Sequence, residues 1–209
     1  MIFQCLNSHI ALSDHITDKA NFFMYNIIMD FINQLDISTL NFMEQIRAPF
    51  LTIFFKIFTY LGEWNVGLFL LLIVSFLLIV KKKNKYNLII WLSAGGGVIT
   101  AYIFKFAFDR VRPIGGLIQE SSSSFPSLHA IVSISFYFLL AYLTTQETKN
   151  PILKYSAIIA GVFIVLSLGF SRLYLGVHYL SDVLAGYAIG DIWFLIGVYG
   201  LKFINRKKL

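Results

Sequence analysis

The chain has 209 residues, of which 57% are hydrophobic and only 13% charged, and its mean hydropathy is +0.73. Soluble domains carry about a quarter charged residues, and a large soluble helical core would need charged outer faces that this chain lacks. The formal net charge of +6 does not indicate nucleic-acid binding, because the basic residues lie in short runs between long apolar blocks. Composition therefore favours an integral membrane protein.

Residues 1–62 are the least regular part of the chain. The apolar stretch 22–31 is too short to cross a bilayer, which takes about 20 residues, and residues 37–61 have an apolar face interrupted by Glu44, Arg47, Pro49 and Lys56. This pattern is typical of a helix that lies along the membrane surface. We predict an N-terminal polar and interfacial helical segment over residues 1–62; the alternative is a weak first span within residues 19–62.

Five apolar blocks follow, each approaching or reaching the length that a membrane-crossing helix needs. They cover residues 64–80, 88–108, 128–142, 152–170 and 183–203. We therefore predict an all-α fold, a polytopic transmembrane helical bundle with five spans over residues 63–209, and a sixth span only if residues 19–62 supply it. No room remains for a separate soluble domain.

The positions of the basic residues predict the orientation in the membrane. They follow the first block, separate the third from the fourth, and follow the last: Lys81, Lys82, Lys83, Lys85, Lys149, Lys154, Arg206, Lys207 and Lys208. With five spans these regions fall on one side, which the positive-inside rule makes cytoplasmic. We expect a multi-pass protein of the cell membrane, with the connections 109–127 and 171–182 on the outer face.

The first polar cluster lies where the second block ends. Lys105 and Arg112 are seven residues apart, so on a continuing helix they share a face, and Pro113 would end that helix. A lysine at such a place usually extends its ammonium group to the lipid headgroups. Asp109 and Arg110 are interpreted as the solvated start of the loop.

The second cluster leads into the third block. Pro126 and Ser127 predict a helix start with free backbone N–H groups and a hydroxyl that could bind an anion. Leu128 and His129 follow in the first turn. Taken alone, the pattern is more often just a capped helix with a histidine at the membrane interface.

The third cluster contains Ser171, Arg172, His178 and Asp182. His178 and Asp182 are four residues apart, so on a helix the carboxylate could orient the imidazole, as in catalytic triads. A structural salt bridge at a helix start would have the same spacing. Asp191 lies about 13 Å further along the last predicted helix, where we expect it to hydrogen-bond a neighbouring helix.

The three clusters indicate a functional site only when they are considered together, because all are predicted on one side of a protein with few charges. Ionisable residues near membrane depth are costly and indicate function. Arginine and lysine hold phosphate oxygens, and histidine can serve as a covalent nucleophile in phosphoryl transfer. The combination indicates phosphate chemistry.

In order along the chain, Lys-x6-Arg-Pro, Pro-Ser-x-His and Ser-Arg-x5-His-x3-Asp, from Lys105 to Asp182, resemble the three signature motifs of the type 2 phosphatidic acid phosphatase superfamily. The resemblance implies a phosphohistidine intermediate and no metal or other cofactor. It implies His178 as nucleophile, Asp182 as its orienting residue and His129 as the acid that protonates the leaving oxygen. The phosphate-binding residues implied are Lys105, Arg112, Ser127, Leu128, His129, Ser171 and Arg172.

Two features depart from the family pattern. Leu128 stands where the family usually has glycine, and we count five spans where related proteins commonly have six. The backbone donors of the second motif are unaffected by Leu128, but its side chain could reshape the pocket or the acceptor site.

We therefore expect a membrane lipid phosphatase or diphosphatase whose partners are the membrane and a lipid phosphate substrate, with no nucleic acid. Phosphatidate, phosphatidylglycerol phosphate, diacylglycerol pyrophosphate and undecaprenyl pyrophosphate remain open as substrates. One alternative is a phosphotransferase using the same phosphohistidine, and another is a non-enzymatic protein that binds lipid phosphate. A metal enzyme is disfavoured, because one carboxylate and two histidines among three cations are a poor site for a divalent ion.

Overall fold

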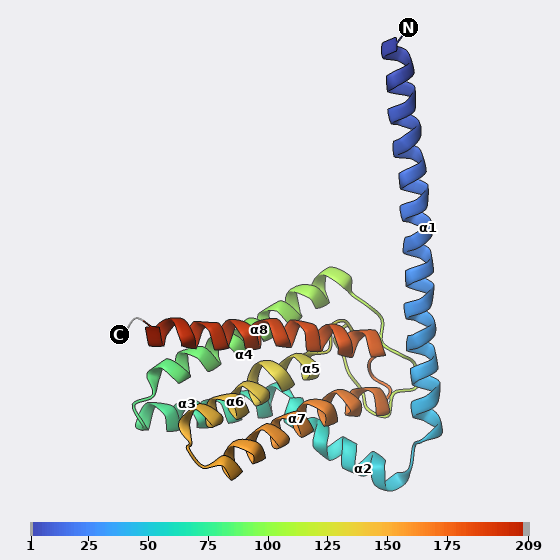
Figure 1. The fold of residues 1–209 in the computed structure, drawn as a ribbon. Helices are drawn as coiled ribbons and strands as arrows, with labels where there is room; N and C mark the ends of the chain where they lie inside the picture. The colour runs from blue at the N-terminus through green and yellow to red at the C-terminus, as the bar shows by residue number, and fades with distance from the viewer. Residues whose placement is uncertain (1, 207–209) are drawn as a thin grey trace. The chain divides into compact units, whose positions relative to one another are not determined.

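The computed structural model describes the backbone of residues 2–206 and the side chains of residues 21–206, and within these residues it is helical without strands (Figure 1). Lys207 and Lys208, which contributed to the predicted basic side, lie outside the described residues. The chain divides into two compact units, residues 1–38 and 39–209. Most of helix α1 (Ile2–Gln45) forms the first unit.

The second unit contains the remaining helices. In chain order they are α2 (Pro49–Phe58), η1 (Thr59–Gly62), α3 (Trp64–Val80), α4 (Asn84–Phe108), α5 (Leu128–Val132), η2 (Ser133–Phe138), α6 (Leu139–Glu147), α7 (Pro151–Tyr174) and α8 (Leu180–Arg206). The segments α5, η2 and α6 follow one another without a break, and η2 is a π-helical insertion of the kind often found near functional sites. This run lies inside the bundle, because α4, α7 and α8 all contact it while α3 packs on α4.

The predicted all-α membrane bundle is confirmed, with a difference in how the first span is built. Four helices are long and apolar enough to cross a membrane, namely α4, the α5–η2–α6 run, α7 and α8. The predicted span 64–80 corresponds to α3, which has 17 residues and passes the same test only together with the preceding segment Pro49–Gly62, across a bend of 54°. Residues 49–62, expected in the interfacial segment, therefore reach the length of a span only together with α3. The division into an N-terminal segment and a phosphatase domain at residue 62 stays a prediction.

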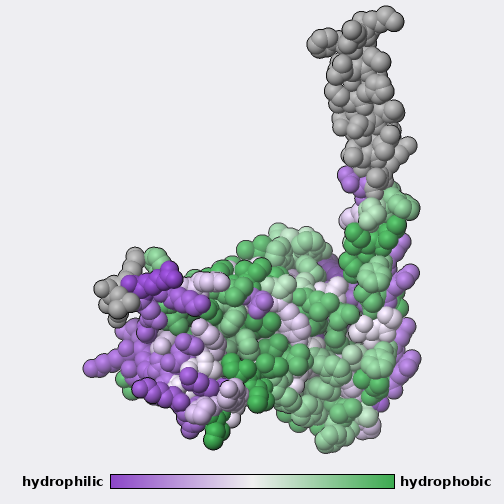
Figure 2. All heavy atoms as spheres, in the orientation of Figure 1, coloured by the Kyte–Doolittle hydropathy of each residue, from purple (hydrophilic) through white to green (hydrophobic). Residues whose placement is uncertain are grey.

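The surface of the bundle agrees with burial in a bilayer. Large apolar side chains are exposed along α3, α4, α7 and α8, for example Ile99, Phe163 and Leu184. Figure 2 shows hydrophobic residues over the middle of the bundle and hydrophilic ones gathered near the end where α8 finishes. That end carries Lys83, Lys85 and Arg206.

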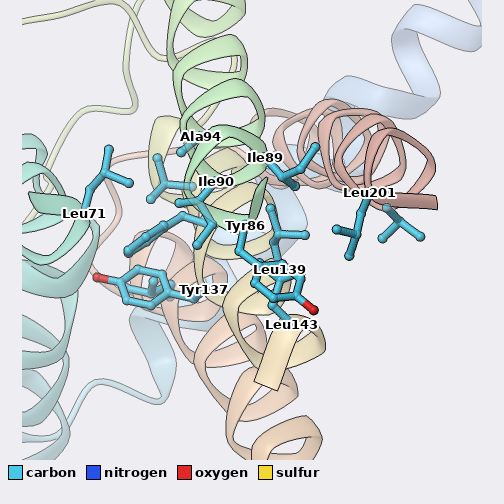
Figure 3. Packing of buried hydrophobic residues seen from close by; sticks show 13 residues of the cluster. Leu71, Tyr86, Ile89, Ile90, Ala94, Tyr137, Leu139, Leu143 and Leu201 are labelled. Carbon is cyan, nitrogen blue, oxygen red and sulfur yellow. The ribbon is translucent and has the colours of Figure 1, made fainter. Parts of the chain in front are cut away.

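The main core surrounds the inner helical run. Ile89 and Ile90 of α4 and Leu139 of α6 are almost completely buried, and Figure 3 shows them packed with Tyr86, Leu143 and Leu201. Gly186 of α8 allows a close approach, since a Cβ there would lie 2.7 Å from the Ser127 carbonyl oxygen. Packing of α8 against residue 127 fixes the point where the inner run begins, which is also where the polar clusters meet.

Candidate active site

The three polar clusters meet around one cavity of about 300 Å³. Six of the residues predicted to act in the site line it: Lys105, Arg112, Leu128, His129, Arg172 and His178. The α4–α5 connection, the α7–α8 connection and the segment η1 all reach this cavity. Helix ends and loops therefore bring together residues from positions 59 to 182.

His178 lies in the short connection between α7 and α8, two residues before α8 begins. The connection turns at Gly176, whose φ of +68° favours glycine. Arg112 Nη1 lies 3.1 Å from His178 Nε2. A guanidinium can only donate, so Nε2 is the acceptor nitrogen and the proton of the neutral ring is on Nδ1. The unshared electron pair of Nε2 therefore faces the cations of the cavity.

Asp182 lies behind this histidine and is completely buried. Its Oδ2 is 3.5 Å from His178 Nδ1 and accepts a 2.9 Å hydrogen bond from the Tyr179 backbone N–H. Arg110 Nη1 donates to Asp182 Oδ1 at 2.6 Å and stacks over the ring of Tyr179. The sequence predicted that His178 and Asp182 share a helix face. They meet instead across the start of α8, since the histidine precedes the helix.

The environment of His178 favours its neutral form. Burial comes first in lowering the pKa of His178 well below its ordinary value of 6.5, and the charges of Arg172, Arg112 and Lys105 lower it further. A neutral imidazole is the form that can attack phosphorus. The cations therefore act on His178 as well as on any bound anion.

Each of the three cations is held by backbone or side-chain oxygens. Arg112 donates from Nε to the Ser122 carbonyl at 2.6 Å and from Nη1 to the Val177 carbonyl at 2.9 Å. The Lys105 ammonium donates to the Ser123 carbonyl. These bonds fix the directions of the two side chains, so the cavity is preorganised for an anion.

Arg172 is fully buried at the end of α7 and has two different partners. Its Nη1 donates to the Thr59 hydroxyl at 2.8 Å, and its Nη2 pairs with Glu120. Glu120 Oε2 also lies 3.6 Å from Arg112 Nη2. A carboxylate thus bridges two guanidinium groups, as a phosphoryl group would.

His129 projects from the first turn of α5 and is 6% exposed. Its Nε2 has no hydrogen-bond partner among the described residues and lies 3.7 Å from Glu63 Oε1. Gly62 packs directly against the ring, since a Cβ there would lie 2.2 Å from His129 Cδ2. The ring is thereby held in place while its Nε2 remains available to a ligand.

The two predicted serines differ in what their hydroxyls do. Ser127 is completely buried, its Oγ has no partner among the described residues, and its backbone N–H donates to the Asp182 carbonyl at 3.1 Å. Ser171 Oγ instead donates to the Leu168 carbonyl of its own helix at 2.7 Å and does not line the cavity. The structure does not bring Ser171 to the predicted phosphate position.

Four residues of the site escaped the sequence analysis: Thr59, Glu63, Arg110 and Glu120. Arg110 was interpreted as solvated loop, but it pairs with buried Asp182; its place within the first motif was the available signal. Glu120 is the one carboxylate between Arg110 and Ser127, which could have drawn attention to it. Thr59 and Glu63 carry no local signal, because only the fold brings η1 to the cavity.

No group of three or more His, Cys, Asp or Glu side chains within the described residues could hold a metal ion. The chemistry assembled here consists of histidines, carboxylates and cations of the protein. Asp191 lies away from it: the residue is exposed on α8 and forms no hydrogen bond with a described residue. The interhelical bond expected for Asp191 is therefore not formed.

A second, almost entirely apolar cavity of about 370 Å³ adjoins the first. It lies between α3, α4 and the start of the inner run, with Leu71, Val98 and Phe136 in its walls. Both cavities share the lining residues Gly62, Glu63, Trp64, Tyr102 and Leu128. An anion-binding space thus continues into a space suited to a hydrocarbon chain, with Leu128 at the junction.

Known proteins resemble this chain in sequence and fold. The family model described as the PAP2 superfamily matches residues 86–206. Phosphatidylglycerophosphatase B of Bacillus subtilis is 35% identical over 156 residues, which cover 72% of this chain and 75% of that protein. Decaprenylphosphoryl-5-phosphoribose phosphatase of Mycobacterium tuberculosis is 29% identical over 141 residues, covering 63% and 70%.

A comparison with solved structures also matches this chain to a PAP2-type phosphatase. The crystal structure of a transmembrane PAP2-type phosphatidylglycerolphosphate phosphatase from Bacillus subtilis aligns with a TM-score of 0.74 and 29% identity, over 84% of this chain and 87% of that one. The alignment covers more of the chain than the motif region 105–182 alone.

Proposed function

Because the chain belongs to the PAP2 superfamily, and because its relatives are membrane lipid phosphatases, we propose that it hydrolyses a lipid phosphate through a phosphohistidine intermediate without a metal ion. One observation carries the proposal: the unprotonated nitrogen of neutral His178 faces a cavity that contains Lys105, Arg112 and Arg172. A site that only binds phosphate needs the cations but not this nucleophile.

In the first step His178 Nε2 attacks phosphorus and the bond to the leaving oxygen breaks on the opposite side. Attacking and leaving atoms lie roughly in line in such transfers. Arg112, Arg172 and Lys105 stabilise the phosphoryl oxygens, while Asp182 stabilises the positive charge that develops on the imidazole. His129 Nε2 gives its proton to the leaving oxygen.

In the second step a water molecule takes the place of the leaving group. His129, now neutral, accepts a proton from that water as its oxygen attacks phosphorus and the P–N bond breaks. His178 is restored and inorganic phosphate departs. The incoming water and the leaving oxygen use the same side of the phosphoryl group, so one histidine can serve both steps.

The apolar cavity supports a lipid as the carrier of the phosphate. A chain bound between α3 and α4 would place its headgroup at the junction with the cation-lined cavity. Phosphatidylglycerol phosphate is the first substrate to test, because both the Bacillus subtilis relative and the Bacillus subtilis solved structure are named for it. The basic residues at the opposite end of the bundle support a cell-membrane location with the site on the outer face.

The test is phosphate release from a panel of lipid phosphates in detergent with excess EDTA, comparing wild type with His178→Ala and Lys149→Ala. Lys149 is exposed and distant from the motifs, so its variant controls for handling. Chelator-resistant release that is lost only in His178→Ala, together with a phosphoprotein trapped by rapid quenching in alkali, is the expected result. Release that continues in His178→Ala would contradict the phosphohistidine, and transfer of the phosphate to an added alcohol instead of water would indicate a transferase.

A further inference from the structure

Glu63 comes from the bend between η1 and α3, outside the family-matched residues 86–206. The backbone at the bend is fixed, because the Glu63 N–H donates to the Tyr60 carbonyl at 3.1 Å and Gly67 N–H donates to the Glu63 carbonyl at 2.8 Å. The side chain is 32% exposed. It is therefore a well-placed carboxylate that still reaches the open space of the site.

Glu63 lies on the side of the cavity where the leaving group departs. Its Oε1 is 3.7 Å from His129 Nε2, the nitrogen that protonates the leaving oxygen. It also lines both the cation-lined cavity and the apolar cavity. A headgroup that links the phosphate to a hydrocarbon chain must pass this carboxylate.

Arg172 and Arg112 attract the Glu63 carboxylate from a distance without contacting it. No lysine or arginine among the described residues forms an ion pair with it, whereas Glu120 engages both Arg112 and Arg172. A carboxylate so placed accepts hydrogen bonds from hydroxyl groups and repels a second negative charge. These properties act on the leaving group, not on the phosphoryl group that is transferred.

We propose that Glu63 determines specificity for the leaving group, favouring one with a free hydroxyl beside the leaving oxygen over one whose leaving oxygen belongs to a second phosphate. The inference rests on the proposed lipid phosphatase activity. Release of a lipid alcohol with a neighbouring hydroxyl lets Glu63 accept a hydrogen bond from it. Cleavage of a lipid pyrophosphate would instead bring a second phosphate, bonded directly to the leaving oxygen, against the carboxylate.

Three substrates with the same diacylglycerol part separate these effects. The leaving group of phosphatidylglycerol phosphate has a hydroxyl beside the leaving oxygen and its phosphodiester charge further along the glycerol. That of phosphatidate is diacylglycerol without another headgroup. In diacylglycerol pyrophosphate the leaving oxygen belongs to the second, charged phosphate itself. The variants are the neutral Glu63→Gln and Glu63→Ala and the charge-preserving Glu63→Asp. Glu147→Gln is a matched control, because Glu147 pairs with Lys83 away from the site.

The measured quantity is kcat/KM for each lipid divided by that for phosphatidate, so that any difference in the folded fraction cancels. In Glu63→Gln and Glu63→Ala we expect the pyrophosphate ratio to rise about tenfold, which corresponds to about 1.4 kcal/mol, and the phosphatidylglycerol phosphate ratio to fall several-fold. Glu63→Asp and Glu147→Gln should keep the wild-type ratios.

Equal changes for all three lipids in the neutral variants, or no change, would overturn the assignment while leaving the proposed phosphatase activity intact. Wild-type protein that releases phosphate from none of the three lipids would overturn both. A change in the ratios that is as large in Glu63→Asp as in Glu63→Gln would also count against the proposal, because the charge would then not be the cause.

Discussion

The contact of Glu120 with two arginines leads to a prediction about phosphate affinity. In the free protein the carboxylate pairs with Arg172, which is completely buried, and lies 3.6 Å from Arg112. A phosphoryl group needs the same guanidinium donors and must displace the carboxylate before it binds. Glu120→Gln removes this competition with little change of shape.

The size of the effect follows from the bonds that are exchanged. A hydrogen bond to a charged group contributes about 1.5–3 kcal/mol, and Glu120 is 20% exposed, so the lower end applies. Because about 1.4 kcal/mol corresponds to a factor of ten in affinity, removing the Glu120 carboxylate should strengthen the binding of inorganic phosphate about tenfold. Breaking a buried pair costs about 3–5 kcal/mol, so the unliganded variant should unfold at a lower temperature because Arg172 loses its counter-charge.

Two measurements check this reasoning. The inhibition constant of inorganic phosphate should fall in Glu120→Gln, and phosphate should raise the unfolding temperature of the variant more than that of the wild type, since the ligand replaces the lost charge. Glu147→Gln serves as a control. An unchanged or higher inhibition constant in Glu120→Gln would refute the idea that this carboxylate competes with phosphate.

Two further predictions concern His178 and the residues that act on it. Burial, and then the charges of Arg172 and Arg112, hold the pKa of His178 well below 6.5, so kcat/KM should persist below pH 6.5 and be lost only as the pH falls through that lowered pKa. Arg112→Met removes one of the charges that lower the pKa, so the acidic limb of its pH profile should move to higher pH. An acidic limb that does not move would contradict this account. Arg110 Nη1 donates to Asp182 Oδ1 at 2.6 Å. Arg110→Ala should therefore lower kcat about 10- to 100-fold with little change in KM, the size of loss that follows when a residue that orients a functional group is removed. Arg110→Lys should restore part of the lost kcat. Equal activity of the Arg110→Ala and Lys149→Ala proteins would show that Arg110 has no positioning role.

Much of the site could be predicted because its chemistry lies in short segments with fixed spacing. Lys105 and Arg112 flank a helix end, and His178 and Asp182 flank a helix start, so local geometry alone brings each pair together. Long apolar blocks likewise indicate membrane helices whatever their tertiary arrangement. These signals require no knowledge of how distant segments pack.

The remainder could not be predicted because it depends on tertiary packing. Nothing near Thr59 or Glu63 shows that η1 packs between His129 and Arg172, since the bend that makes this possible is a property of how α3 and α2 fit the bundle. Ser171 illustrates the opposite case: it belongs to a motif, yet its hydroxyl bonds to its own helix. Sequence spacing locates a residue along a helix but does not determine which partner its side chain reaches.

The two unpredicted carboxylates together give the cavity a charge suited to one kind of anion. In the free protein the charges of Lys105, Arg112 and Arg172 are offset in part by Glu63 and Glu120, while Arg110 and Asp182 neutralise each other. When a phosphate monoester dianion displaces Glu120, its two charges and that of Glu63 balance the three cations. A lipid pyrophosphate would place a second phosphate at the leaving oxygen, beside Glu63, where no further lysine or arginine lines the described cavity. We therefore expect Glu120 to give way to the phosphoryl group and Glu63 to act against a second phosphate at the leaving oxygen.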